Sequence, residues 1–166
     1  MSAYVAVNTY TYSVTYVSEK ILLSLKEIVR ESGLDPGKLA DEWEVLQRGI
    51  STWIRTRNLE TVHLEVYDPV TDGLIGRWDF DIAYDEYGDD GMWVDTDLIR
   101  YHIRKQGKLP SQCDYQIVVH NKPGHPDVEG WSSCSMRSTD GFTRHAIGTN
   151  INGSNGLGAR VVYWNN

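Results

Sequence analysis

Residues 61–84 read TVHLEVYDPVTDGLIGRWDFDIAY, and this stretch decides the fold. Apolar side chains occupy every second position from Val62 to Val66 and again from Trp78 to Tyr84. Such alternation is typical of strands that bury one face. Residues 68–73, DPVTDG, carry the proline, aspartates and glycine of a turn. The stretch therefore predicts an antiparallel hairpin with one buried face.

Upstream of this hairpin the apolar spacing changes to that of helices. Apolar residues recur at steps of three or four from Val17 to Val29 and from Leu39 to Trp53, which predicts two amphipathic helices. Asp35-Pro36 supplies an N-cap and a first-turn proline for the second helix. Before the first helix, residues 4–12 alternate Val and Tyr with small polar residues and predict an extended segment or a first strand.

Downstream, the pattern predicts a third helix at residues 96–106 and a strand at 115–120. The rest of the chain differs, because residues 122–166 hold seven of the 15 glycines and few large aliphatic residues. Glycine raises the entropic cost of ordering the backbone, so we expect a looser, β-rich tail. Short strands are predicted in it at Ser133–Ser138, Phe142–Ile147 and Ala159–Trp164. The sequence thus describes one α+β domain.

Composition excludes several classes of function. The chain has 166 residues and a formal net charge of −7, which argues against binding to nucleic acid or to anionic lipid. Its start lacks the basic and apolar regions of a secretory signal, and no apolar run is long enough to span a membrane. We therefore expect a cytoplasmic protein whose cysteines, Cys113 and Cys134, are reduced thiols.

The candidate catalytic residues are few. Asp79 and Asp81 point to one face of their strand, where they could bind a metal ion or act as paired carboxylates. The commoner meaning of such a pattern is a solvated strand face. The acidic residues of 85–91 do not follow calcium-loop spacing, and the five histidines form neither HxH nor HExxH. The residues favour a binding module over an enzyme, with no cofactor or bound metal.

Two further groups are candidates for binding. Trp131 and Trp164 lie in the glycine-rich tail, where they could anchor it to the body or contact a partner. Basic residues concentrate only at the third predicted helix and just beyond it: Arg100, Arg104, Lys105 and Lys108. This basic patch is either a partner contact or a solvated helix face.

Several stretches spread along the chain resemble bacterial HORMA-domain proteins, of the second of the two bacterial HORMA families. The stretches are YTYSVTYV (10–17), SGLDP (32–36), LEVYDP (64–69), GRWDFD (76–81), KPGHPDVEGWS (122–132) and RSTDG (137–141). The likeness covers nearly the whole chain.

The resemblance implies a HORMA fold, with three helices on an antiparallel or mixed sheet and a C-terminal safety belt that changes position. When closed, the belt wraps a closure-motif peptide, which adds to the sheet as a strand. It also implies a role in CBASS antiphage defence. There the closed protein would bind and activate a cGAS/DncV-like nucleotidyltransferase, and an AAA+ ATPase would open it. No direct contact with nucleic acid or membrane is implied.

Carried onto this sequence, the resemblance divides the chain into a body (1–120) and a belt (121–166). The third helix and the strand at 115–120 would border the peptide groove, and residues 1–8 resemble the part that the ATPase grips. The residues predicted to contact the peptide are Ile117, Val118, Val119, Trp131, Phe142 and Trp164. Those predicted to contact the enzyme are Arg100, Arg104 and Lys105. Two alternatives remain: a metal-assisted hydrolase using Asp79 and Asp81, and a structural subunit that does not switch.

Overall fold

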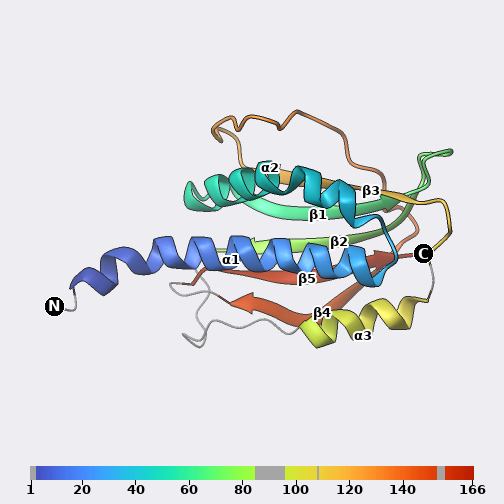
Figure 1. The fold of residues 1–166 in the computed structure, drawn as a ribbon, viewed down its shortest axis with the longest axis horizontal. Helices are drawn as coiled ribbons and strands as arrows, with labels where there is room; N and C mark the ends of the chain where they lie inside the picture. The colour runs from blue at the N-terminus through green and yellow to red at the C-terminus, as the bar shows by residue number, and fades with distance from the viewer. Residues whose placement is uncertain (1–2, 85–95, 108, 153–155) are drawn as a thin grey trace.

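The hairpin predicted at residues 61–84 forms the centre of a five-stranded sheet. The computed structural model describes residues 3–84, 96–107, 109–152 and 156–166 (Figure 1). In it β1 (Leu59–Tyr67) pairs antiparallel with β2 (Leu74–Ala83), and Leu64 lies opposite Trp78. Both of these side chains are buried against the helices.

Three further strands complete the sheet: β3 (Asp114–Asn121), β4 (Thr143–Asn152) and β5 (Gly158–Asn165). Every pairing is antiparallel and the order is β3-β1-β2-β5-β4, so β3 and β4 form the edges. The last two short strands predicted in the tail fall largely within β4 and β5. The first, Ser133–Ser138, is wrong, because this segment has no strand partner.

The three helices are α1 (Ala3–Glu31), α2 (Pro36–Arg55) and α3 (Thr96–Gln106). Figure 1 shows α1 lying along the middle of the sheet, α2 towards β1 and β3, and α3 beside β4. The inward stripes of α1 and α2 are fully buried at residues such as Ile21 and Ile50. The predicted α+β class and the three helices on one sheet are confirmed.

Residues 4–12 are helical, which corrects the prediction of an extended segment. Tyr10, Val14 and Val17 continue the apolar stripe of α1 by steps of four and three, and the two valines are buried. The Tyr10 hydroxyl also donates to the Ile54 carbonyl of α2 over 3.2 Å. This packing outweighs the β preference of the Val and Tyr residues, since propensity is a weak prior against tertiary contacts.

The start of α2 is as predicted. The Asp35 carboxylate accepts the Gly37 N–H at 2.9 Å, and Pro36 occupies the first helical position, where a missing N–H costs nothing. Just before it, Gly33 adopts a φ of 79°, a left-handed conformation that ends α1 and suits glycine. These caps fix the angle at which α2 leaves α1.

The second face of the hairpin is also buried, which corrects the prediction of one buried face. Three of its polar side chains are almost fully enclosed, with exposed fractions of 5% for His63, 0% for Glu65 and 6% for Asp79. The tail covers them with two of its own side chains, Arg137 and Trp164. Alternation in β1 and β2 could not predict this cover, because it comes from residues more than 70 positions away.

The remaining predictions concern the acidic loop, Lys108, the two cysteines and membrane spans. The acidic loop at 85–91 and Lys108 lie outside the described residues. Cys113 and Cys134 are both free. Within the described part of the chain, no helix is both long and apolar enough to cross a membrane.

After β3 the chain crosses over α2 before it returns to the sheet, and we call residues 122–142 the crossing segment (Figure 1). Trp131 fastens it to α2: its indole N–H donates to the Val45 carbonyl at 2.9 Å, and its ring meets Trp53 edge-on at 5.0 Å. The indole lies where a side chain at Gly49 would be. Trp53 in turn donates its indole N–H to the Pro126 carbonyl at 2.7 Å.

Gly49→Ala tests this anchor. A methyl group there overlaps the Trp131 indole, so we expect the free energy of unfolding to fall by about 1–3 kcal/mol. We also expect faster hydrogen exchange of the crossing segment, which mass spectrometry would measure.

The matched control is the same substitution in a Trp131→Ala background. There the overlap is gone, and the better helix propensity of alanine should make Gly49→Ala stabilising by about 1 kcal/mol. Equal effects of Gly49→Ala in both backgrounds would contradict the anchor.

Candidate functional site

A groove of about 980 Å³ lies between the outer edge of β3, one face of α2 and the crossing segment. In the described residues β3 pairs only with β1, so its other edge is free. An edge strand directs alternate backbone N–H and C=O groups away from its partner, and these can pair with another chain. The groove therefore contains an unused hydrogen-bonding edge of the sheet.

The α2 wall of the groove is one helical stripe, which includes Lys38, Glu42 and Val45. The Lys38 ammonium is not free, because it donates to the Asp114 carboxylate at 3.2 Å and to the Tyr115 carbonyl. These bonds tie the start of α2 to the start of β3.

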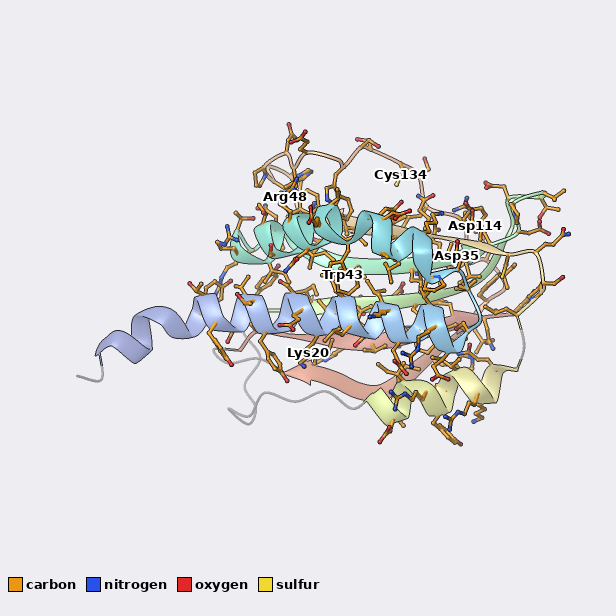
Figure 2. All side chains as sticks on the ribbon, in the orientation of Figure 1. Lys20, Asp35, Trp43, Arg48, Asp114 and Cys134 are labelled. Carbon is orange, nitrogen blue, oxygen red and sulfur yellow. The ribbon has the colours of Figure 1, made fainter. Side chains whose placement is uncertain are left out.

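The Tyr115 hydroxyl strengthens this junction. It donates to the Asp35 carbonyl and accepts the Leu39 N–H at 3.0 Å. Figure 2 shows Asp35 and Asp114 together at this end of the molecule. Burial raises the pKa of the Tyr115 hydroxyl, so it remains a donor at neutral pH. The groove thus has a fixed width at one end.

The opposite wall is the part of the crossing segment that follows Trp131. Residues 132–136 line the groove or the smaller hollow beside it, and Cys134 is drawn there in Figure 2. Their backbone groups make no hydrogen bond to the rest of the described chain. The groove is therefore bordered by unpaired backbone on two sides.

Arg137 fastens the far end of this span to the sheet. Its guanidinium pairs with Glu65 at 3.0 Å and with Asp72 at 2.7 Å, and it lies 3.5 Å from the centre of the Tyr67 ring. Its backbone N–H also donates to Glu65 at 2.8 Å. Glu65 is wholly buried, and Arg137 is the cation that compensates its charge.

Asp79 organises the face of the sheet next to this anchor. Arg77 donates to its carboxylate at 2.8 and 3.0 Å, the Trp164 indole at 2.8 Å, and His63 lies 2.6 Å away. Burial alone would raise the pKa of Asp79, but the hydrogen bonds from His63 and Arg77 hold it below its usual value. Asp79 is thus a buried, paired carboxylate and not part of a solvated face.

This geometry bears on the predicted hydrolase. Both Asp79 oxygens already accept hydrogen bonds from protein groups, and Asp81 accepts one from the Thr61 hydroxyl at 3.2 Å. Among the described residues, no three His, Cys, Asp or Glu side chains gather closely enough to hold a metal ion. The carboxylates support the sheet, and the geometry does not favour metal-assisted hydrolysis.

The structure brings together four of the six residues predicted to contact a peptide. Ile117, Val118, Val119 and Trp131 all line the groove, whereas Phe142 and Trp164 do not. Trp164 instead covers the far face of β2, where it stacks with Arg77, 5.2 Å from the centre of the indole. It is an anchor of the tail.

The predicted enzyme contact lies elsewhere. Arg104 and Lys105 are exposed on α3, but Arg100 is paired with Glu27 of α1 and with Asp97. We expected α3 to border the groove, and this is wrong: α3 packs beside β4, at the opposite edge, and α2 takes its place.

The residue patterns did not identify Gly49 and Glu65, the positions at which the crossing segment contacts α2 and the sheet. Gly49 lies inside the second predicted helix and Glu65 alternates with apolar residues in the predicted hairpin, and neither was assigned a contact. A signal existed in each case: a glycine inside a strong helical stripe marks a close approach, and Glu65 lies within a stretch shared with the family. Neither signal names its partner, because Trp131 and Arg137 are 82 and 72 residues away.

Arg137→Ala tests the second anchor. It leaves the Glu65 charge buried without a partner, so we expect a loss of about 3 kcal/mol in the free energy of unfolding, measured by urea denaturation. Adding Glu65→Gln should recover part of the loss, since the uncompensated charge is gone. Arg144→Ala, at an exposed arginine of β4, is the matched control and should have little effect. A similar loss in both arginine variants would contradict this role.

Solved structures share this fold. A chain of the crystal structure of a mitotic checkpoint complex matches with a TM-score of 0.72 at 12% identity, covering 93% of this chain and 98% of that one. Caenorhabditis elegans HTP-1 bound to a HIM-3 closure motif matches with a TM-score of 0.71 at 12% identity, covering 92% and 89%. The Escherichia coli MS115-1 HORMA:CdnC:Trip13 complex contains a chain that matches with a TM-score of 0.61 at 9% identity, covering 91% and 86%. At these identities the likeness establishes the fold alone.

The family comes from the sequence itself. No curated protein matches it closely enough to count as a relative. The family model described as Bacterial HORMA domain 2, however, matches residues 1–166, which is the entire chain. This protein therefore belongs to the bacterial HORMA domain 2 family.

Proposed function

We propose that this protein is a conformational-switch regulator that captures a closure-motif peptide in the groove. The observation that carries the proposal is the free edge of β3 beneath a segment fastened at both ends. An extended peptide can add to such an edge as a strand, with backbone hydrogen bonds for affinity and side-chain contacts for specificity. Residues 132–136 offer it a second line of unpaired backbone.

In this proposal residues 1–120 are the body and residues 121–166 are the belt. The arrangement described above is then the closed form. Support comes from related folds, since the HTP-1 structure contains a bound closure motif. Proteins with this fold generally act as adaptors or signalling proteins, which agrees with a binding role and not a catalytic one.

Opening the belt has a high energetic cost in this form. It breaks the Arg137–Glu65 pair, withdraws Trp131 from Gly49 and removes β5 from β2, with the Trp164 hydrogen bond. A charge left buried without its partner costs about 3–5 kcal/mol, so a partial opening that withdraws Arg137 while Glu65 stays covered is disfavoured. Spontaneous release should be slow, and this supports a dedicated machine that opens the protein.

We assign that role to an AAA+ ATPase, and the output to a cGAS/DncV-like nucleotidyltransferase of a CBASS antiphage system in the cytoplasm. The support is the E. coli complex in which a HORMA protein is assembled with CdnC and Trip13. The ATPase would grip residues 1–8, and Figure 1 shows the start of α1, from Ala3, projecting beyond the sheet. Arg104 and Lys105 on α3 remain the proposed contacts to the enzyme.

Peptide capture can be tested with a random twelve-residue library displayed on phage and selected against the full-length protein. Selected peptides should slow hydrogen exchange at residues 115–121 and 132–136. Arg137→Ala should raise their dissociation rate by roughly tenfold, because an unfastened belt releases its peptide sooner. Arg144→Ala should leave that rate unchanged.

Two results would count against peptide capture. Protection confined to the α3 and β4 side of the sheet would place the peptide elsewhere. A dissociation rate that is indifferent to Arg137 would mean that the belt does not retain it, as in a structural subunit that does not switch.

The output can be tested with a purified cGAS/DncV-like nucleotidyltransferase encoded beside this protein. Nucleotide product, followed by chromatography, should rise only when this protein and a selected peptide are both present. Addition of the AAA+ ATPase with ATP should lower it again. If the rate of the enzyme does not change when this protein and its peptide are added, this part of the proposal is refuted.

A further inference from the structure

A chain of three hydrogen-bonded side chains runs from the middle of the sheet to the groove. Asp79 on β2 lies 2.6 Å from Nδ1 of His63 on β1, and His63 Nε2 lies 2.8 Å from Nδ1 of His120 on β3. Asp79 and His63 are buried, whereas His120 is exposed and lines the groove. This network of three side chains is therefore buried at Asp79 and reaches solvent at His120.

The buried end determines which nitrogens carry hydrogen. Asp79 is an ionised carboxylate that can only accept, so His63 Nδ1 carries a hydrogen and donates it. Arg77 already balances the charge of Asp79, and a second cation in this buried cluster would be costly. In the tautomer that fits these contacts, His63 Nε2 accepts, and the hydrogen between the two rings belongs to His120 Nδ1.

The same reasoning shows which nitrogen of His120 is left to bind a ligand. A neutral His120 that donates through Nδ1 has a lone pair on Nε2 and no hydrogen there. We propose that His120 is a specificity-determining residue, whose Nε2 accepts a hydrogen bond from a donor side chain of the bound peptide. This inference rests on the proposed capture of a peptide in the groove.

The charged groups of the groove favour the same class of peptide. Asp41, Glu42 and Asp127 present carboxylates to it, which also accept. Its lysine, Lys38, is occupied by Asp114 and by the Tyr115 carbonyl. Among donors, cationic side chains should therefore exceed hydroxyl and amide side chains. A peptide carboxylate in the groove would meet the like charge of the three acidic side chains.

The test compares peptides selected from the random twelve-residue phage library by the wild-type protein and by His120→Leu. Wild-type selections should share one position rich in Arg, Lys, Ser, Thr, Asn or Gln, and this preference should vanish with His120→Leu. Replacing that donor by alanine in a synthetic peptide should weaken wild-type binding roughly 3- to 10-fold and leave His120→Leu binding unchanged.

Two further variants control the comparison. His120→Gln keeps an acceptor at this place and should retain the donor preference, which separates hydrogen bonding from loss of structure. His145→Leu alters an exposed histidine on β4, outside the groove, and should select the same peptides as the wild type.

The possible failures are distinguishable. Peptides that bind the groove, with exchange protection at β3 but no donor position, would overturn this inference and leave peptide capture standing. The inference would also be overturned if the alanine substitution in the peptide and His120→Leu weakened binding independently of each other. Selections that protect no residue of β3 would overturn both proposals.

Discussion

A sheet has two edge strands, and the C-terminal strands of this protein extend the sheet at only one side. Pairing β5 with β2 places the C-terminal hairpin beyond β2 and leaves β3 as a free edge. The backbone N–H and C=O groups on the outer side of β3 face the groove, where they can pair with water or with another extended chain. The position of β5 at one side of the sheet thus leaves an edge available for pairing at the other.

Buried charge holds that arrangement in place. Glu65 and Asp79 lie on the strand face that the helices do not cover, and each is balanced by an arginine, Arg137 or Arg77. A buried ion pair is weak evidence for overall stability, because desolvation offsets its attraction. Its value here is geometric, since a carboxylate without its cation is strongly disfavoured. The tail is therefore favoured in the position that brings Arg137 to Glu65.

The sequence predicted the local structure well and the long-range contacts poorly. Alternation in residues 61–84 and the Asp35-Pro36 cap were sufficient for the hairpin and for α2, because both depend on neighbours in the chain. The N-terminal strand was wrong, because a helical partner outweighed β propensity. Four of the residues that the family resemblance assigned to peptide contact line the groove, and their contact with a peptide stays a prediction. Gly49 and Arg137 were not identified, since their roles exist only once distant residues meet.

The span between Trp131 and Arg137 is short. Its five residues, 132–136, reach at most about 18 Å when fully extended. Trp131 joins their start to α2 and Arg137 joins their end to Glu65 of β1, so with α2, β1 and β3 they form a ring, and a peptide threaded through it would be linked to it topologically. A long ligand with folded domains on both sides of its bound segment could not slip out lengthwise, however weak its contacts. For such a ligand the complex would last as long as the ring stays closed. The stability of the closed ring and the affinity for the bound peptide would then be separate properties.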